Sequence, residues 1–108
     1  MKYSELDFKG GLPSWDIYRH YPEDQHFTKV LTQDLLTIDY SKYTIYLGWY
    51  YDRYAINIVP LIVKMGKRSF SDWNPFYTLL VFKHEEVFEK LQEVINNSEK
   101  YYNLKVFS

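Results

Sequence analysis

Alternating apolar and polar positions in the middle of the chain predict a β-strand over residues 43–50. The apolar set at alternate positions is Tyr43, Ile45, Leu47 and Trp49. A period of two is that of a half-buried strand. A polar Asp52-Arg53 break and a second run rich in β-branched residues, 54–63, predict an antiparallel hairpin. Because proline donates no ladder hydrogen bond, we expect a bulge or a sheet edge at Pro60.

Four further segments follow the hairpin. Residues 64–75 hold glycine, serine, asparagine and proline and are expected to form a loop. Residues 76–82 are apolar at both sets of alternate positions, which predicts a central strand. Residues 85–98 carry an apolar stripe at helical spacing and end near Asn96-Asn97, which predicts a helix with a C-terminal stop there. Alternation over residues 102–106 predicts a last strand.

The first 40 residues give a weaker pattern. Residues 10–13 predict a turn, and residues 15–21 fit a short strand that ends at Pro22. Residues 27–31 and 35–38 fit two short strands, or one turn of helix and a strand. Strands combined with one late helix predict an α+β fold, an antiparallel β-sheet with one long helix of the C-terminal half packed on one face. The length of 108 residues fits a single domain spanning residues 1–108.

Composition narrows the class of protein. The absence of cysteine excludes a disulfide framework and thiolate metal sites. No apolar run approaches the ~18 residues of a membrane span, and no signal peptide follows Met1, so we expect a cytoplasmic protein without membrane contact. A net charge of −1 argues against general nucleic-acid binding. That total conceals an acidic first third, because residues 1–40 carry seven acids and four bases while residues 41–83 carry two acids and six bases.

Aromatic residues are unusually frequent. They make up 20% of the chain, as 12 Tyr, 7 Phe and 3 Trp. Tyrosine buries a large ring while its hydroxyl stays hydrated, and it is favoured at recognition surfaces. Aromatic side chains also favour strands and their cores. Because one small core cannot bury so many rings, we expect some of them to form a recognition surface.

Residues with catalytic or metal-binding potential do not form a familiar motif. His20, His26 and His84 show no His-x-x-x-His spacing and are interpreted as surface histidines. Glu89 and Glu93 share a helix face, which is most simply a solvated one. Lys64, Lys67 and Arg68 lie near Phe70 and Trp73, a small basic and aromatic cluster that resembles a nucleic-acid contact but is more typical of a solvated loop. We therefore expect no catalytic residue, no metal and no cofactor.

Residues 43–91 resemble the small immunity proteins of bacterial polymorphic toxin and contact-dependent growth inhibition systems. The resemblance rests on Tyr43-Thr44-Ile45, Gly48-Trp49-Tyr50, the turn Asp72-Trp73-Asn74-Pro75, and a helix with Glu86-Val87 and Leu91. The turn is one residue shorter than the Asp-Trp-x-x-Pro of that group, and residues 1–42 match no part of it. The resemblance implies a cytosolic antitoxin that binds and neutralises one cognate toxin domain, commonly a nuclease.

An inhibitor of a nuclease gains from carboxylates, because the active site that it covers binds a polyanion. We expect Trp15, Tyr18 and Tyr21 to anchor the toxin, with Asp16, Glu23 and Asp24 facing its basic residues. Trp49 and Trp73 are expected in the core. Two alternatives stay open. One is a self-associating structural or regulatory module, for which a homodimer is the expected form, and the other is a small RNase that uses His20 or His26.

Overall fold

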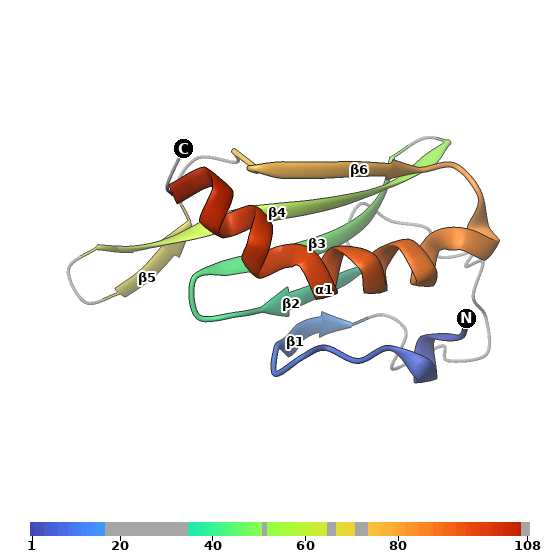
Figure 1. Cartoon of the computed structure of the whole chain (residues 1–108), viewed down its shortest axis with the longest axis horizontal. Coiled ribbons are helices and arrows are strands. Elements are labelled where there is room, and N and C mark those ends of the chain that lie inside the picture. The colour runs from blue at the N-terminus through green and yellow to red at the C-terminus, as the bar shows by residue number, and fades with distance from the viewer. Residues whose placement is uncertain (17–34, 51, 65–66, 71–73, 107–108) are drawn as a thin grey trace.

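The computed structural model describes residues 1–16, 35–50, 52–64, 67–70 and 74–106, and they form an α+β fold. A six-stranded antiparallel sheet carries one long helix on one face (Figure 1). The strands are β1 (Leu12–Asp16), β2 (Leu36–Asp39), β3 (Tyr43–Tyr50), β4 (Arg53–Lys64), β5 (Lys67–Phe70) and β6 (Tyr77–Val81). The helical segments are η1 (Tyr3–Glu5), η3 (His84–Glu86) and α1 (Val87–Val106). The predicted fold class is confirmed.

The predicted hairpin is the centre of the sheet. β3 and β4 pair antiparallel from Tyr43↔Pro60 to Tyr50↔Arg53, without a register shift. β4 also pairs with β6 over residues 54–58 and with β5 over residues 61–64. Pro60 lies between these two stretches, where the proline nitrogen has no ladder bond to supply. Pro60 is therefore not at a bulge, since the pairing with β3 is regular, but on the other side of β4 it lies at a local gap between two partner strands among the described residues.

The core lies between α1 and one face of the sheet. The helix buries its stripe of Val87, Phe88, Leu91, Val94 and Ile95. These side chains pack against alternate residues of the strands, namely Leu36, Ile38, Ile45, Leu47, Ile56, Ile58 and Val81. Each large apolar side chain buried in this way stabilises the fold by about 1.5–3 kcal/mol relative to exposure. We call the sheet face that packs against α1 the helix face.

The opposite face is polar and small at its centre. Thr44 and Asn57 are buried there. The Thr44 hydroxyl donates to Asp39, and the Thr78 hydroxyl donates to Asn57. Both buried polar groups therefore have partners, as buried polar groups require.

The helix is longer than the sequence pattern predicted. The Asn96-Asn97 pair does not end it, because the Asn97 amide donates to the Glu93 carbonyl one turn earlier and Asn96 accepts from Gln92. The predicted strand over residues 102–106 is wrong, since these residues continue α1. The rings of Tyr101 and Tyr102 follow the buried stripe at helical spacing and pack against the core.

Two assignments around β6 also need correction. Among the described residues β6 pairs with β4 alone, so it is an edge strand and not a central one. Part of the predicted loop over residues 64–75 is strand β5. In the first 40 residues the turn falls at Lys9-Gly10, both with positive φ, and the strands are β1 and β2. The predicted segment 27–31 lies outside the described residues.

Most of the described aromatic rings lie in or against the core. Tyr77 stacks on Tyr101 with ring centroids 4.1 Å apart, and Tyr43 contacts Tyr102 at 5.6 Å. These contacts cover the sheet under the last turns of α1, a region where the apolar stripe of the helix is thin. Among described aromatic residues, the large exposed ones are Trp15 and Phe82. No helix among the described residues is long and apolar enough to cross a membrane.

Candidate functional site

Two of the six predicted toxin-binding residues are described, and both lie on β1. Trp15 is 53% exposed, and Asp16 is half-buried. The Tyr3 hydroxyl donates to the Asp16 carboxylate, so this acid also holds the N-terminal segment against the strand. The other four predicted residues, Tyr18, Tyr21, Glu23 and Asp24, lie outside the described residues.

β1 presents its large apolar side chains away from the helix. Leu12, which is 72% exposed, lies opposite Asp39, and Trp15 lies opposite Thr37. Opposite residues in a ladder share a face, so both side chains lie on the face opposite α1. Pro13 and a register shift between Pro13 and Trp15 interrupt the strand. We call Leu12, Pro13, Trp15 and Asp16 the Trp15 edge.

A second candidate is a cavity of about 330 Å³ beside the C-terminal half of α1. It is lined by Lys9, Tyr40, Tyr43, Ile95, Asn96, Ser98 and Glu99. The size is at the lower end of small-molecule sites. The N-terminal segment, the β2–β3 turn and the helix each contribute to its wall.

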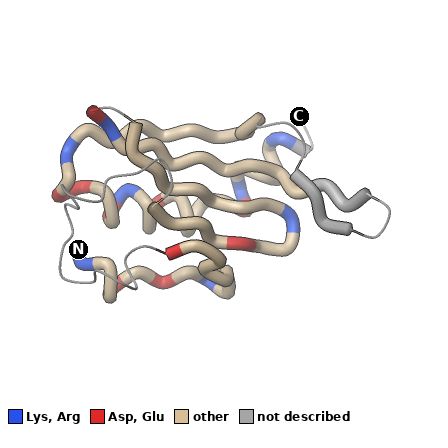
Figure 2. The backbone as a smooth tube through the Cα atoms, turned by 180° about the vertical axis from the view of Figure 1, so that it is seen from behind, with Lys and Arg blue, Asp and Glu red and all other residues tan. Residues whose placement is uncertain are grey.

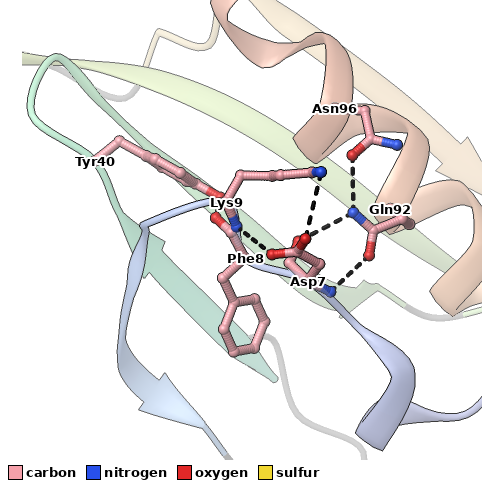
Figure 3. A network of polar contacts seen from close by, with 6 residues as sticks. All are labelled: Asp7, Phe8, Lys9, Tyr40, Gln92 and Asn96. Atoms are coloured by element: carbon pink, nitrogen blue, oxygen red, sulfur yellow. Dashed lines mark hydrogen bonds and ion pairs between the residues drawn. The ribbon is translucent and has the colours of Figure 1, made fainter.

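A polar network fixes the N-terminal side of this cavity (Figure 3). The Asp7 backbone N–H donates to Gln92 Oε1 at 2.8 Å, and Gln92 Nε2 donates to the Asp7 carbonyl at 3.0 Å. Lys9 contacts the Asp7 carboxylate twice, by its backbone N–H at 2.9 Å and its Nζ at 3.3 Å. The backbone N–H of Lys9 is the main cause of the lowered pKa of Asp7. On the other side, the Tyr40 hydroxyl donates to the Phe8 carbonyl at 2.6 Å.

Glycine is required at the point where this segment crosses β2. A Cβ on Gly11 would lie 2.5 Å from Cζ of Tyr40 and 2.6 Å from Cγ2 of Ile38. The backbone therefore approaches the Tyr40 ring as closely as a residue without a side chain allows. This approach places Lys9 at the mouth of the cavity.

The hydroxyl groups inside the cavity are hydrogen-bonded to one another or to the backbone. The Tyr43 and Ser98 hydroxyls lie 2.7 Å apart, and Ser98 Oγ donates to the Ile95 carbonyl at 2.9 Å. Burial raises the pKa of Tyr40 and of Tyr43. Both phenols therefore stay protonated at neutral pH, and their hydroxyls are already engaged, Tyr40 with the Phe8 carbonyl and Tyr43 with Ser98. No local pattern in the sequence indicates this cavity, because its walls come from segments far apart in the chain.

His84 is not a surface histidine as predicted. It is half-buried, its Nδ1 is hydrogen-bonded to the Tyr54 hydroxyl, and its ring stacks on Trp49 at 5.7 Å. Trp49 packs against the core, as expected. His20, His26 and Trp73 lie outside the described residues.

The two helix acids singled out from the sequence each lie near a cation, and the basic residues 64 and 67 belong to two different strands. Glu89 lies 4.0 Å from the N-terminal ammonium group, and Glu93 lies 3.6 Å from Lys90. Lys64 and Lys67 end paired strands, opposite one another in the β4–β5 ladder. Within the described part of the chain, no group of three or more potential ligands could hold a metal ion.

Comparison of the chain with protein-family models, with curated proteins and with solved structures gives no significant match.

Proposed function

We propose that this chain is an antitoxin, a cytoplasmic protein that binds and neutralises one protein toxin. The observation that carries the proposal is the Trp15 edge. It combines a half-exposed tryptophan with an exposed leucine and an aspartate on one terminal strand of the sheet. Tryptophan is among the residues most enriched at the energetic centres of protein interfaces.

The resemblance to immunity proteins supports the same function. The segment that carries it, residues 43–91, corresponds to β3, β4, β6 and the first turns of α1. These elements supply much of the core, and Trp49 of the Gly-Trp-Tyr motif packs against that core. We call them the frame. The frame holds the Trp15 edge through β2, which pairs with β1 on one side and β3 on the other. Changing the residues of this edge while the rest of the fold is kept is a simple way to match different toxins.

The electrostatics of the acidic first third fit a basic partner. Nucleases bind polyanions, and an inhibitor with carboxylates beside its anchor residues gains association rate and specificity. Asp16 follows Trp15 in β1 but lies opposite Leu36, on the helix face, and Glu5 and Asp7 are exposed on the adjoining N-terminal segment. In the view from behind, acidic positions recur along the N-terminal segment and β1 (Figure 2). The proposed target is therefore a nuclease domain, blocked at its active site or along its substrate path.

The test is a calorimetric titration of the full chain with the C-terminal domain of the protein encoded directly upstream. We expect one-to-one binding per chain at nanomolar affinity, about −12 kcal/mol. Trp15→Ala is expected to weaken binding by at least about tenfold, as for a central aromatic anchor. Phe82→Ala is the matched control, because Phe82 is a ring of similar exposure at the opposite edge of the sheet. Absence of heat at micromolar concentration, or equal losses in both variants, would contradict the proposal.

A further inference from the structure

The last strand of the sheet, β6, has no strand of the described residues on its outer edge. Within the described part of the chain, β6 pairs only with β4, and it forms the outermost strand opposite β1 (Figure 1). Every second residue of an edge strand directs its backbone N–H and C=O outward, ready for another strand. Leu80 is 43% exposed, and Phe82, directly after the strand, is 61% exposed. We call Tyr77–Val81 together with Phe82 the β6 edge.

The other terminal strands carry the usual protection against pairing. β1 has Pro13, a register shift and Asp16. β5 contains Lys67 and Arg68 in four residues. Proline, irregular register and charge are the devices that keep edges apart.

The β6 edge has none of these devices. Residues 76–82 contain no charge and no proline, and β6 pairs with β4 in an unbroken register. The strand is tan along its whole length in the view from behind (Figure 2). Such a segment, exposed on an edge, readily pairs with another strand. A protein that protects two terminal strands and leaves the third open has an edge suited to pairing.

We propose that β6 pairs antiparallel with β6 of a second copy of the chain, which joins two sheets into one. The second copy is favoured as the occupant because the edge is complementary to itself. With the two-fold axis at Leu79, Thr78 lies opposite Leu80 of the second copy, and Tyr77 lies opposite Val81. No like charges meet, and each pair unites residues that favour strands. This edge has no charged side chain that would form an ion pair with a basic or acidic partner strand.

The flanks of β6 define where the pairing ends. In the same register Pro75 lies opposite Lys83 of the second copy, and proline provides no N–H to extend the ladder. Leu80 and Phe82 lie on the face opposite α1, since Ala55 pairs with Leu80 and the Arg53 guanidinium lies over the Phe82 ring at 5.4 Å. Pairing covers part of this exposed apolar surface.

This dimer does not cover the Trp15 edges, which lie on the two outer sides of the joined sheet, because β1 and β6 lie at opposite edges. Self-association and the proposed toxin binding therefore use different surfaces. A dimer would bind two toxin domains.

The test is sedimentation equilibrium of the full chain from micromolar to about millimolar concentration. We expect a monomer–dimer equilibrium. Leu80→Glu is expected to raise the dimer dissociation constant by at least about tenfold, because a charge on an edge strand opposes pairing. Leu12→Glu is the matched control on β1, where the leucine has the same face and greater exposure. Far-UV circular dichroism of both variants verifies the fold.

A charge exchange tests the register. In the double variant Thr78→Lys/Leu80→Glu, the introduced lysine of each copy faces the introduced glutamate of the other. We expect the double variant to dimerise more tightly than Leu80→Glu alone. A wild-type chain that stays monomeric near millimolar concentration overturns the proposal. So does an equal effect of Leu12→Glu, or a double variant as weak as the single one.

Discussion

Removal of the Tyr43 hydroxyl tests how the helix is held on the sheet at the cavity. Tyr43 is 7% exposed, and its hydroxyl lies 2.7 Å from Ser98 Oγ. Because the Ser98 hydroxyl donates to the Ile95 carbonyl, Tyr43 is the donor and Ser98 the acceptor of the shared bond. Tyr43→Phe removes a donor and leaves the Ser98 donor satisfied. We therefore expect a loss of about 0.5–1.5 kcal/mol in the free energy of unfolding.

The reverse truncation is expected to cost more. Ser98→Ala leaves the Tyr43 donor without its acceptor in a nearly buried place, which costs about 1–3 kcal/mol. The better helix propensity of alanine returns a few tenths of a kcal/mol of this. The double variant loses both partners together, so the two effects do not add. We expect a coupling energy of about 1 kcal/mol in the double-mutant cycle.

Urea unfolding followed by tryptophan fluorescence measures these differences, since Trp49 packs against the core and reports its loss. For a chain of this size, 1 kcal/mol corresponds to a shift in Tm of about 4–8 °C. Effects of Tyr43→Phe and Ser98→Ala that add within about 0.3 kcal/mol would refute the bond between the two hydroxyls. A Ser98→Ala variant as stable as Tyr43→Phe would refute the assignment of the donor.

Two more predictions concern the core and the pH dependence of stability. Leu91→Ala removes a fully buried side chain and is expected to cost about 2–5 kcal/mol, whereas Leu104→Ala, at 60% exposure on the same helix, should cost less than about 0.5 kcal/mol in urea unfolding. The raised pKa of Tyr40 means that above about pH 10 the unfolded chain releases a proton that the folded chain retains, so stability falls as pH rises. Tyr40→Phe should make urea midpoints less dependent on pH between about pH 9 and 11, and an unchanged slope would contradict the assignment.

The elements predicted correctly are those whose pattern is local. The β3–β4 hairpin and the first part of α1 could be predicted because period two and period 3.6 are visible within ten to fifteen residues. The end of α1 could not. Residues 102–106 alternate between apolar and polar in a way that fits a strand. Only the packing of the Tyr101 and Tyr102 rings onto the sheet makes helix the better solution.

β6 illustrates a different limit of sequence reasoning. Its apolar residues on both faces predicted a buried central strand. The strand is present, but among the described residues it pairs with β4 alone and lies at an edge of the sheet. Hydrophobicity alone does not distinguish a strand covered on both sides from an edge available for a partner. Among the candidate residues, Trp15 is exposed at an edge as expected, whereas the cavity depends on contacts between Asp7 and Gln92 that no local pattern indicates.

The distribution of aromatic rings unites the two proposals. The abundance of tyrosine suggested a broad recognition surface, but the rings near the end of α1 are largely used to complete a small core. Among described aromatic residues, the strongly exposed rings are Trp15 and Phe82, and they lie at opposite edges of one sheet. Two interaction sites at opposite edges can be disrupted separately. If Trp15→Ala weakens toxin binding without changing self-association, and Leu80→Glu does the reverse, the two edges act independently through the same rigid sheet.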